Sequence, residues 1–186
     1  MADPNTPLKA TNDTKSVSDA LNTALANCYA LYFKTKNFHW HVSGPHFRDY
    51  HLLMDDQAAQ ILSATDAIAE RVRKTGNTTL RSVGDIARHQ TIVDNDAPFV
   101  SAAAMLAELR NDNLKLVENF RAVKDAAEEA RDNATSGIVD EWTDQAEERA
   151  WFLFEASRST EADDVPVGCG ISLSLSRTAA MSDRSS

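Results

Sequence analysis

Residues 39–74 carry the pattern from which the fold can be inferred, and they read HWHVSGPHFRDYHLLMDDQAAQILSATDAIAERVRK. The Ser-Gly-Pro triplet at 43–45 is a helix breaker, because glycine is conformationally free and proline lacks a backbone N–H. A helical pattern of apolar residues covers about 16–42, and a second pattern covers 47–74 before Gly76 ends it. The segment therefore predicts the end of one long helix, a short turn and a complete second helix.

Two further long helical patterns follow, at about 101–130 and 138–157, with a weak break at 133–137. The connection at 77–100 is irregular and has room for one short helix at about 82–89. No region alternates convincingly between apolar and polar residues as a strand would. Four long helices with two short connections and one long one predict an all-α four-helix bundle with a short helix in its middle crossover connection.

The bundle is expected to be a single domain at residues 17–160, which suits a chain of 186 residues and 20.4 kDa. The polar residues 1–16 predict a flexible N-terminal arm, and residues 161–186 predict a flexible C-terminal tail. The chain is 42% hydrophobic and 25% charged, with a mean hydropathy of −0.40. These values are typical of a soluble globular protein.

The sequence lacks the features typical of membrane and secreted proteins. No apolar run approaches the roughly 18 residues that a membrane helix needs, and the N-terminal residues do not resemble a signal peptide. The two cysteines, Cys28 and Cys169, are far apart in the chain, so a disulfide framework is not expected. We therefore expect a cytoplasmic protein that is not associated with a membrane.

The chain has 19 basic and 28 acidic residues, which gives a formal net charge of −9. Such a surface repels nucleic acid unless basic residues are segregated in one place. The formal charge of residues 1–16 is zero, and residues 161–186 are acidic. DNA binding, and with it association with the nucleoid, is therefore disfavoured, whereas cations suit this surface.

Five possible metal ligands stand out by their spacing: His39, His51, Asp55, Asp66 and Glu70. The last four fall within a sector of roughly 100° on the second predicted helix. Carboxylates on an otherwise apolar face are costly to bury without a counter-charge, and a bound cation removes that cost. Imidazole and carboxylate together are a ligand set for Fe, Zn or Mn rather than a thiolate site.

Asp55 and Asp66 are separated by about 16 Å along a straight helix, so one metal centre cannot use both from the same chain. Two arrangements remain. The chain has two separate sites, or a two-fold axis brings His51 and Asp55 of one copy against Asp66 and Glu70 of another.

The run His39-Trp40-His41-Val42, with His51, Asp55, Asp66 and Glu70 at fixed offsets from His39, resembles the Dps family of ferritin-like mini-ferritins. This resemblance covers about residues 15–160 and implies a hollow dodecamer with di-iron ferroxidase centres between two-fold-related subunits. It implies that His39, His51 and Asp55 come from one chain and that Asp66 and Glu70 come from its partner. It also implies oxidation of Fe(II), preferentially by hydrogen peroxide, and storage of ferric mineral in the cavity.

The tryptophans and the acidic residues of the fourth predicted helix are interpreted from their position relative to the five possible ligands and to the apolar pattern. Trp40 adjoins His39 and is expected either to pack in the dimer interface or to accept radicals from the iron centre. The acidic residues near the start of the fourth helix are expected on a solvated face, or lining an iron-entry pore. Trp142 and Trp151 are expected in the core. The pore candidates are Asp140, Glu141 and Asp144.

The sequence thus favours a Dps-like ferroxidase and iron-storage protein that protects against oxidative stress. Iron is the expected metal, and Zn or Mn are possible substitutes. The first alternative is a DNA-compacting protein of the same fold in which iron chemistry is secondary. A ferritin with its site inside one subunit needs Glu-x-x-His pairs on facing helices, and no histidine follows His89. The remaining alternative is a structural bundle without metal.

Overall fold

The computed structural model describes residues 11–158, which form five helices and no strand within that range. The all-α bundle with a short helix in its middle connection is therefore confirmed. None of these helices combines the length and the apolar character needed to cross a membrane. The helices are α1 (Asn12–His41), α2 (Phe47–Lys74), α3 (Val83–His89), α4 (Ala102–Glu129) and α5 (Asn133–Ser157).

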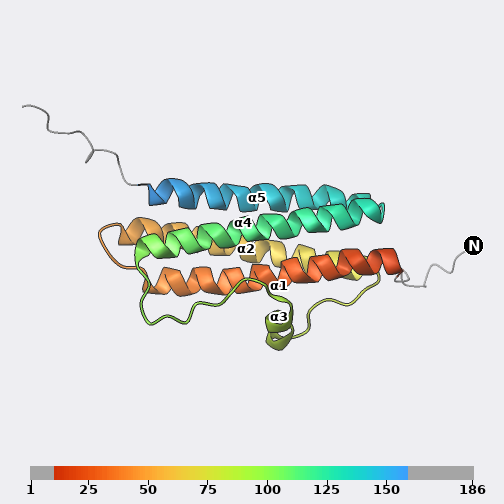
Figure 1. Ribbon diagram of the computed structural model, residues 1–186, viewed down its shortest axis with the longest axis horizontal. Helices are drawn as coiled ribbons and strands as arrows, with labels where there is room; N and C mark the ends of the chain where they lie inside the picture. The colour runs from red at the N-terminus through yellow and green to blue at the C-terminus, as the bar shows by residue number, and fades with distance from the viewer. Residues whose placement is uncertain (1–10, 159–186) are drawn as a thin grey trace, which may run out of the picture.

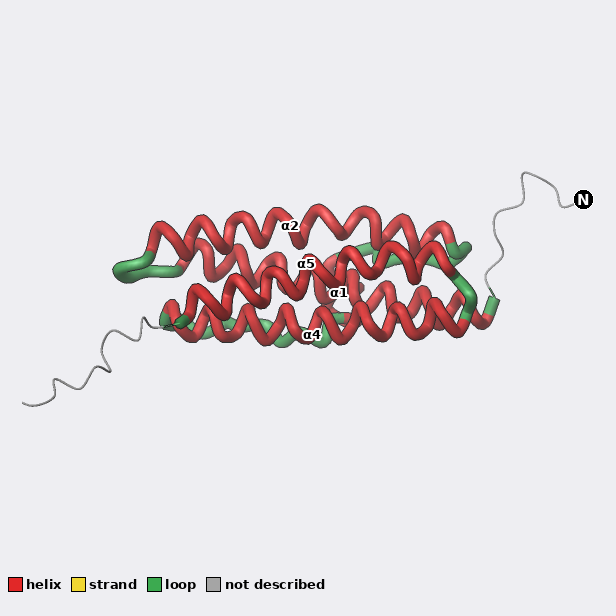
Figure 2. The backbone as a smooth tube through the Cα atoms, turned by 90° about the horizontal axis from the view of Figure 1, so that it is seen from above, coloured by secondary structure: helices red, strands yellow, loops and turns green. Residues whose placement is uncertain are grey.

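The four long helices lie side by side as two hairpins (Figure 1). Contacts are most extensive between α4 and α5 and between α1 and α2, and α1 also packs against α4. The connection from α2 to α4 carries α3 along the outside of α1, where the two helices are in contact. The view from above shows α2 and α4 on opposite sides of the bundle, with α5 and α1 between them (Figure 2).

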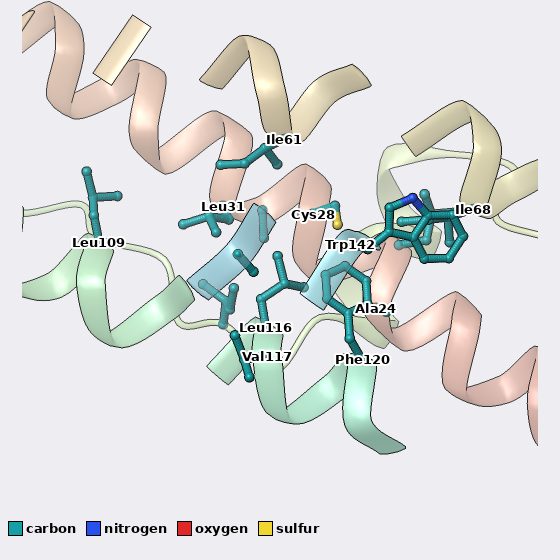
Figure 3. Close-up of a cluster of buried hydrophobic side chains, with 14 of the residues drawn as sticks. Ala24, Cys28, Leu31, Ile61, Ile68, Leu109, Leu116, Val117, Phe120 and Trp142 are labelled. Carbon is teal, nitrogen blue, oxygen red and sulfur yellow. The ribbon is translucent and has the colours of Figure 1, made fainter. Parts of the chain in front are cut away.

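The core is formed by apolar side chains from all four long helices, and Figure 3 shows its centre. Phe120 of α4 and Trp142 of α5 pack with their ring centroids 6.0 Å apart. Cys28 of α1 lies in the same cluster, and burial raises the pKa of its thiol to about 12. Because the thiolate is the reactive form, Cys28 is chemically inert at neutral pH.

Two helix boundaries differ from the sequence-based expectation. The first helix begins at Asn12, because Thr11 caps it and accepts a hydrogen bond from the backbone N–H of Thr14. Residues 12–16 of the predicted arm are therefore helical, while residues 1–10 and 159–186 lie outside the described residues. The last helix begins at Asn133 rather than Ile138, because Asp132 caps it in the same way.

Trp151 was expected in the core, and this expectation is wrong because 58% of its surface is exposed. Trp142, in contrast, is buried as predicted. The apolar run 151–154 covers more than one face of α5, so its residues cannot all point inward. Only Leu153 of this run is buried.

The buried amide of Asn27 is one of the groups that hold the long connection to the bundle. The side-chain oxygen of Asn27 accepts hydrogen bonds from the backbone N–H groups of Thr91 and Ile92, at 2.7 and 3.0 Å. Its side-chain nitrogen donates to the hydroxyl of Thr91 at 2.9 Å. These bonds satisfy backbone groups where the chain passes from α3 toward α4, so that Ile92 can be buried.

We expect Asn27→Ala to lower the free energy of unfolding by about 2 kcal/mol, because it leaves two backbone N–H groups without partners. Urea denaturation followed by circular dichroism measures the loss. Asn111→Ala is the matched control, because Asn111 lies on the exposed face of α4. Equal stability of the two variants would contradict the anchoring role of Asn27.

Candidate metal centre

Two histidines face each other across the turn between α1 and α2. His39 lies in the last turn of α1 and His51 in the second turn of α2, and Gly44 reverses the chain between them with a φ of +116°. The Nδ1 of each ring is 2.8 Å from the backbone oxygen of the other residue. The two rings are stacked, with centroids 3.7 Å apart and an interplanar angle of 19°.

This reciprocal pairing fixes where the protons are. A carbonyl oxygen can only accept a hydrogen bond, so Nδ1 of each ring must carry a proton and donate. In the neutral imidazole, Nε2 then has a free lone pair. Both rings are thus oriented with the nitrogen that binds metals left available, and backbone carbonyls are common partners of metal-binding histidines.

Asp55 is one helical turn beyond His51, and its Oδ1 lies 3.9 Å from Nε2 of His39. Two atoms at this separation can share one ion, because metal–ligand distances of about 2.1 Å are typical for imidazole and carboxylate. His39 thus lies within reach of one ion together with Asp55, and the ring of His51 stacks on that of His39. The donor set fits iron, since all three groups are hard or intermediate ligands.

A lysine that the sequence analysis missed also reaches this carboxylate. Nζ of Lys36 lies 2.6 Å from Oδ1 of Asp55, and only 19% of the lysine side chain is exposed. The hydrogen bond from Lys36 is the main reason that the pKa of Asp55 lies below its ordinary value. Lys36 is three residues before His39, one turn earlier on the same face of α1, and this spacing was the available signal.

Asp66 and Glu70 lie further along α2, away from the histidines. Both side chains are exposed, and Glu70 makes only a surface ion pair with Lys74 at 2.9 Å. In the part of the chain that the structure describes, no three His, Cys, Asp or Glu side chains converge closely enough to hold an ion. Within one subunit His39 lies close to His51 and to Asp55, whereas Asp66 and Glu70 lie elsewhere on α2, so one subunit does not form a complete ligand set.

Apolar side chains are exposed around the same hairpin. Leu62 lies between Asp55 and Asp66 on the same face of α2, and 41% of its surface is exposed. Phe33 and Trp40 of α1 are also exposed and contact each other edge to face, with centroids 6.2 Å apart. An apolar face of this kind, beside polar groups, is typical of a surface that another protein covers.

The acidic residues proposed for a pore lie on the exposed face of α5. Asp140 pairs with Lys124 of α4, and Glu141 accepts a hydrogen bond from Gln145. Asp144 is exposed as well. Their position on one subunit is compatible with a solvated helix face and with a pore lining.

Comparison with known proteins identifies the family of this chain. A family model described as a ferritin-like domain matches residues 18–160. A DNA protection during starvation protein from Brevibacillus brevis is 31% identical, over 74% of this chain and 91% of that protein. A crystal structure of a Dps protein from Bacillus brevis is 30% identical with a TM-score of 0.76, over 80% of this chain and 99% of that one.

The chain belongs to the Dps family of ferritin-like proteins. The resemblance seen in the sequence is thereby confirmed, together with the fold. A Dps protein from Vibrio cholerae O1 shares the fold with a TM-score of 0.75 at 19% identity, over 83% of this chain and 99% of that one. That protein is described as a member of a broad superfamily of ferritin-like diiron-carboxylate proteins.

In this Dps chain we expect Lys36→Gln to tighten the binding of Zn²⁺, used as a redox-inert probe. Lys36 and a metal ion compete for the same carboxylate oxygen, so removing the lysine charge should raise the affinity about tenfold, a gain limited by solvent screening. Isothermal titration calorimetry on the assembled protein measures the affinity.

The matched control is Lys15→Gln, which removes an equally short pair, that of Lys15 with Asp19 at 2.6 Å, on the exposed face of α1. Lys36→Arg keeps the charge and should leave the affinity near that of the wild type. If Lys36→Gln binds Zn²⁺ no more tightly than the Lys15 variant, competition at Asp55 is refuted.

Proposed function

We propose that this Dps protein binds Fe(II) at centres shared by two copies of the chain, oxidises it with hydrogen peroxide, and stores the ferric product. The observation that carries the proposal is the reciprocal pairing of His39 and His51. It directs two metal-binding nitrogens to the side of the hairpin where Asp55 lies. The description of the Vibrio cholerae relative as a diiron-carboxylate protein supports iron as the substrate.

The centre is incomplete in one subunit and is completed by a second. His39, His51 and Asp55 lie near one end of α2, whereas Asp66 and Glu70 lie about 16 Å or more away on the same face. A two-fold axis that sets two α2 helices antiparallel brings these two groups together twice and forms two equivalent centres. The same packing covers the exposed Leu62 between them.

The chemistry requires a site that holds two ferrous ions close to one peroxide. Two Fe(II) ions supply the two electrons that reduce one hydrogen peroxide molecule, and with two water molecules the products are two FeOOH units and four protons. Because both electrons arrive together, hydroxyl radical is not released. Anionic carboxylates favour the ferric product, and the two imidazoles hold the ions in place.

Storage follows if the dimers assemble into a closed shell, and we propose a dodecamer in the cytoplasm. Asp140, Glu141 and Asp144 are the proposed lining of the iron entry, because convergent carboxylates attract Fe(II). Trp40 is proposed to serve both in the interface and as an acceptor of stray oxidising equivalents. Its ring is exposed in a single subunit, where it contacts Phe33, and Trp40 follows His39 directly in the sequence.

We expect His51→Ala/Asp55→Ala to reduce the initial rate of peroxide-driven Fe(II) oxidation at least about a hundredfold, because two ligands of every centre are lost. Stopped-flow absorbance of the ferric product measures the rate. The control is His89→Ala/Asp125→Ala, which removes the same residue types at exposed positions of α3 and α4. Oxidation by the His51/Asp55 variant at the wild-type rate would rule out this centre.

The sharing of each centre between two chains can be tested by mixing two inactive variants. Chains with His51→Ala/Asp55→Ala are reassembled with chains that carry Asp66→Ala/Glu70→Ala. Each mixed dimer then has one intact centre and one fully altered centre, so random mixing should restore about one quarter of the wild-type rate. A mixture that stays inactive, although native mass spectrometry shows mixed dimers, would contradict shared centres.

DNA compaction is the second candidate function, and the name of the Brevibacillus brevis relative favours it. The charge of this chain opposes it, because 28 acidic residues outnumber 19 basic ones. Phosphate contacts are the main source of non-specific affinity for DNA, and they require basic groups.

We expect no retardation of linear duplex DNA in a gel-shift assay at about 1 µM protein and about 100 mM salt. Retardation at this salt concentration that disappears steeply as salt is raised would show phosphate contacts and favour DNA compaction. The measurement is independent of the iron centre, because the His51/Asp55 variant should behave like the wild type.

A further inference from the structure

A second apolar surface lies on the opposite side of the molecule from α3, where α4 and α5 pack side by side (Figure 1). Trp151 and Phe154 of α5 are exposed there, as is Leu114 of α4. Together these side chains line a groove with a volume of about 420 Å³, which we call the α4–α5 groove. Large aromatic side chains clustered at a concave surface are typical of a site that another segment covers.

Two arginines flank the Phe154 end of the α4–α5 groove, whereas Glu118 and Glu147 lie toward its other end. Arg110 lies over the ring of Phe154, with its guanidinium carbon 5.3 Å from the ring centroid, and Arg158 lies over the same ring at 6.0 Å. Arg110 makes no ion pair within residues 11–158, whereas Arg121 at the other end pairs with Glu147 at 2.9 Å. The groove therefore offers aromatic surface and an arginine that no carboxylate of the described residues neutralises.

The chain continues from this end of the groove. Helix α5 ends at Ser157, one turn after Phe154, and the ferritin-like match ends at residue 160. The next residues are acidic, and the following ones alternate between apolar and small or polar side chains. The acidic residues are Glu161, Asp163 and Asp164, and the apolar ones include Val165, Val167, Ile171, Leu173 and Leu175.

The length of this segment matches the groove. Trp151 lies about 9 Å back along α5 from Ser157, at 1.5 Å per residue. An extended chain advances about 3.3 Å per residue, so fewer than ten residues are enough to turn back and pass Trp151. The acidic residues then lie beside Arg110 and Arg158, and the apolar residues lie over Trp151 and Leu114.

We infer that residues 161–175 fold back on their own subunit and dock in the α4–α5 groove. The charges are complementary, and the tether keeps the segment at a high effective concentration next to the groove. A segment from another molecule lacks this advantage. Docking covers aromatic surface that lies at the end of the ferritin-like domain.

The experiment uses the native Cys169, which lies within the docking segment. Cys28 is buried with a pKa of about 12, so it does not compete in thiol oxidation at neutral pH. A second cysteine is placed in the groove by Leu114→Cys, and a separate variant, Glu118→Cys, places it one turn further along. Under mild oxidation of the full-length assembled protein, we expect an intrachain disulfide in most chains for at least one of the two variants.

Non-reducing electrophoresis and peptide mass mapping separate the outcomes. A Cys169 disulfide within one chain supports the inference. A disulfide between chains shows instead that the groove receives the segment of a neighbouring copy. The absence of any disulfide shows that the segment does not dock in the groove. Either of the last two results overturns the inference. The control, Val93→Cys, is exposed on the connection that is tied to α1, and it should give no intrachain link.

The charge contribution is tested in the Leu114→Cys background. We expect Asp163→Asn/Asp164→Asn to slow formation of the intrachain disulfide about threefold at low ionic strength, and about 1 M salt to slow the parent protein by a similar factor. If neither change alters the rate, the acidic residues do not guide docking and the inference as stated is wrong.

Discussion

The two hydrogen bonds between His39 and His51 are the constraint on which the candidate centre depends. The carbonyl oxygen of His39 lies in the last turn of α1, where helix carbonyls lack partners from their own helix. The ring of His51 satisfies it, and the ring of His39 binds back to His51. This pair of hydrogen bonds therefore caps the end of α1 and holds the α1–α2 turn. It also leaves the Nε2 atoms of both rings free to bind a metal ion.

Lys36 supplies a positive charge at the candidate centre. The side chain of Asp55 is 53% exposed and lies beside the imidazole of His39, and Lys36 supplies it with a positive charge at 2.6 Å. A lysine ammonium is a flexible point charge, so it can leave when a more strongly charged ion arrives. Under the proposed function, metal binding therefore exchanges one cation beside Asp55 for another.

The local patterns were enough to predict α2 from Phe47 to Lys74, because a period of 3.6 residues and clear breakers mark both ends. They were not enough to find the start of α5. The stretch 133–137 contains polar residues and a glycine, but Asp132 caps it, and Arg71 of α2 holds that carboxylate at 3.0 Å. This partner is remote in the chain, so the sequence pattern does not show it.

For the candidate centre, too, local sequence patterns predict some positions and miss others. The spacing of His39, His51 and Asp55 predicted that they gather, and the structure places them together. The exposure of Trp151 was missed, because a run of four apolar residues does not indicate which one faces the core. Lys36 was missed because a lysine near possible metal ligands is easily interpreted as a surface residue, and only its contact with Asp55 in the folded chain shows its position.

If the centre is shared as proposed, its chemistry is coupled to assembly. A single subunit offers the histidines and Asp55, while Asp66 and Glu70 lie too far along the same rigid helix to join them. Because an α-helix cannot bend through this distance, folding alone cannot complete the centre. Fe(II) then meets a complete ligand set only where two subunits have already formed the wall of a shell. Oxidation and containment of the product therefore depend on the same contact.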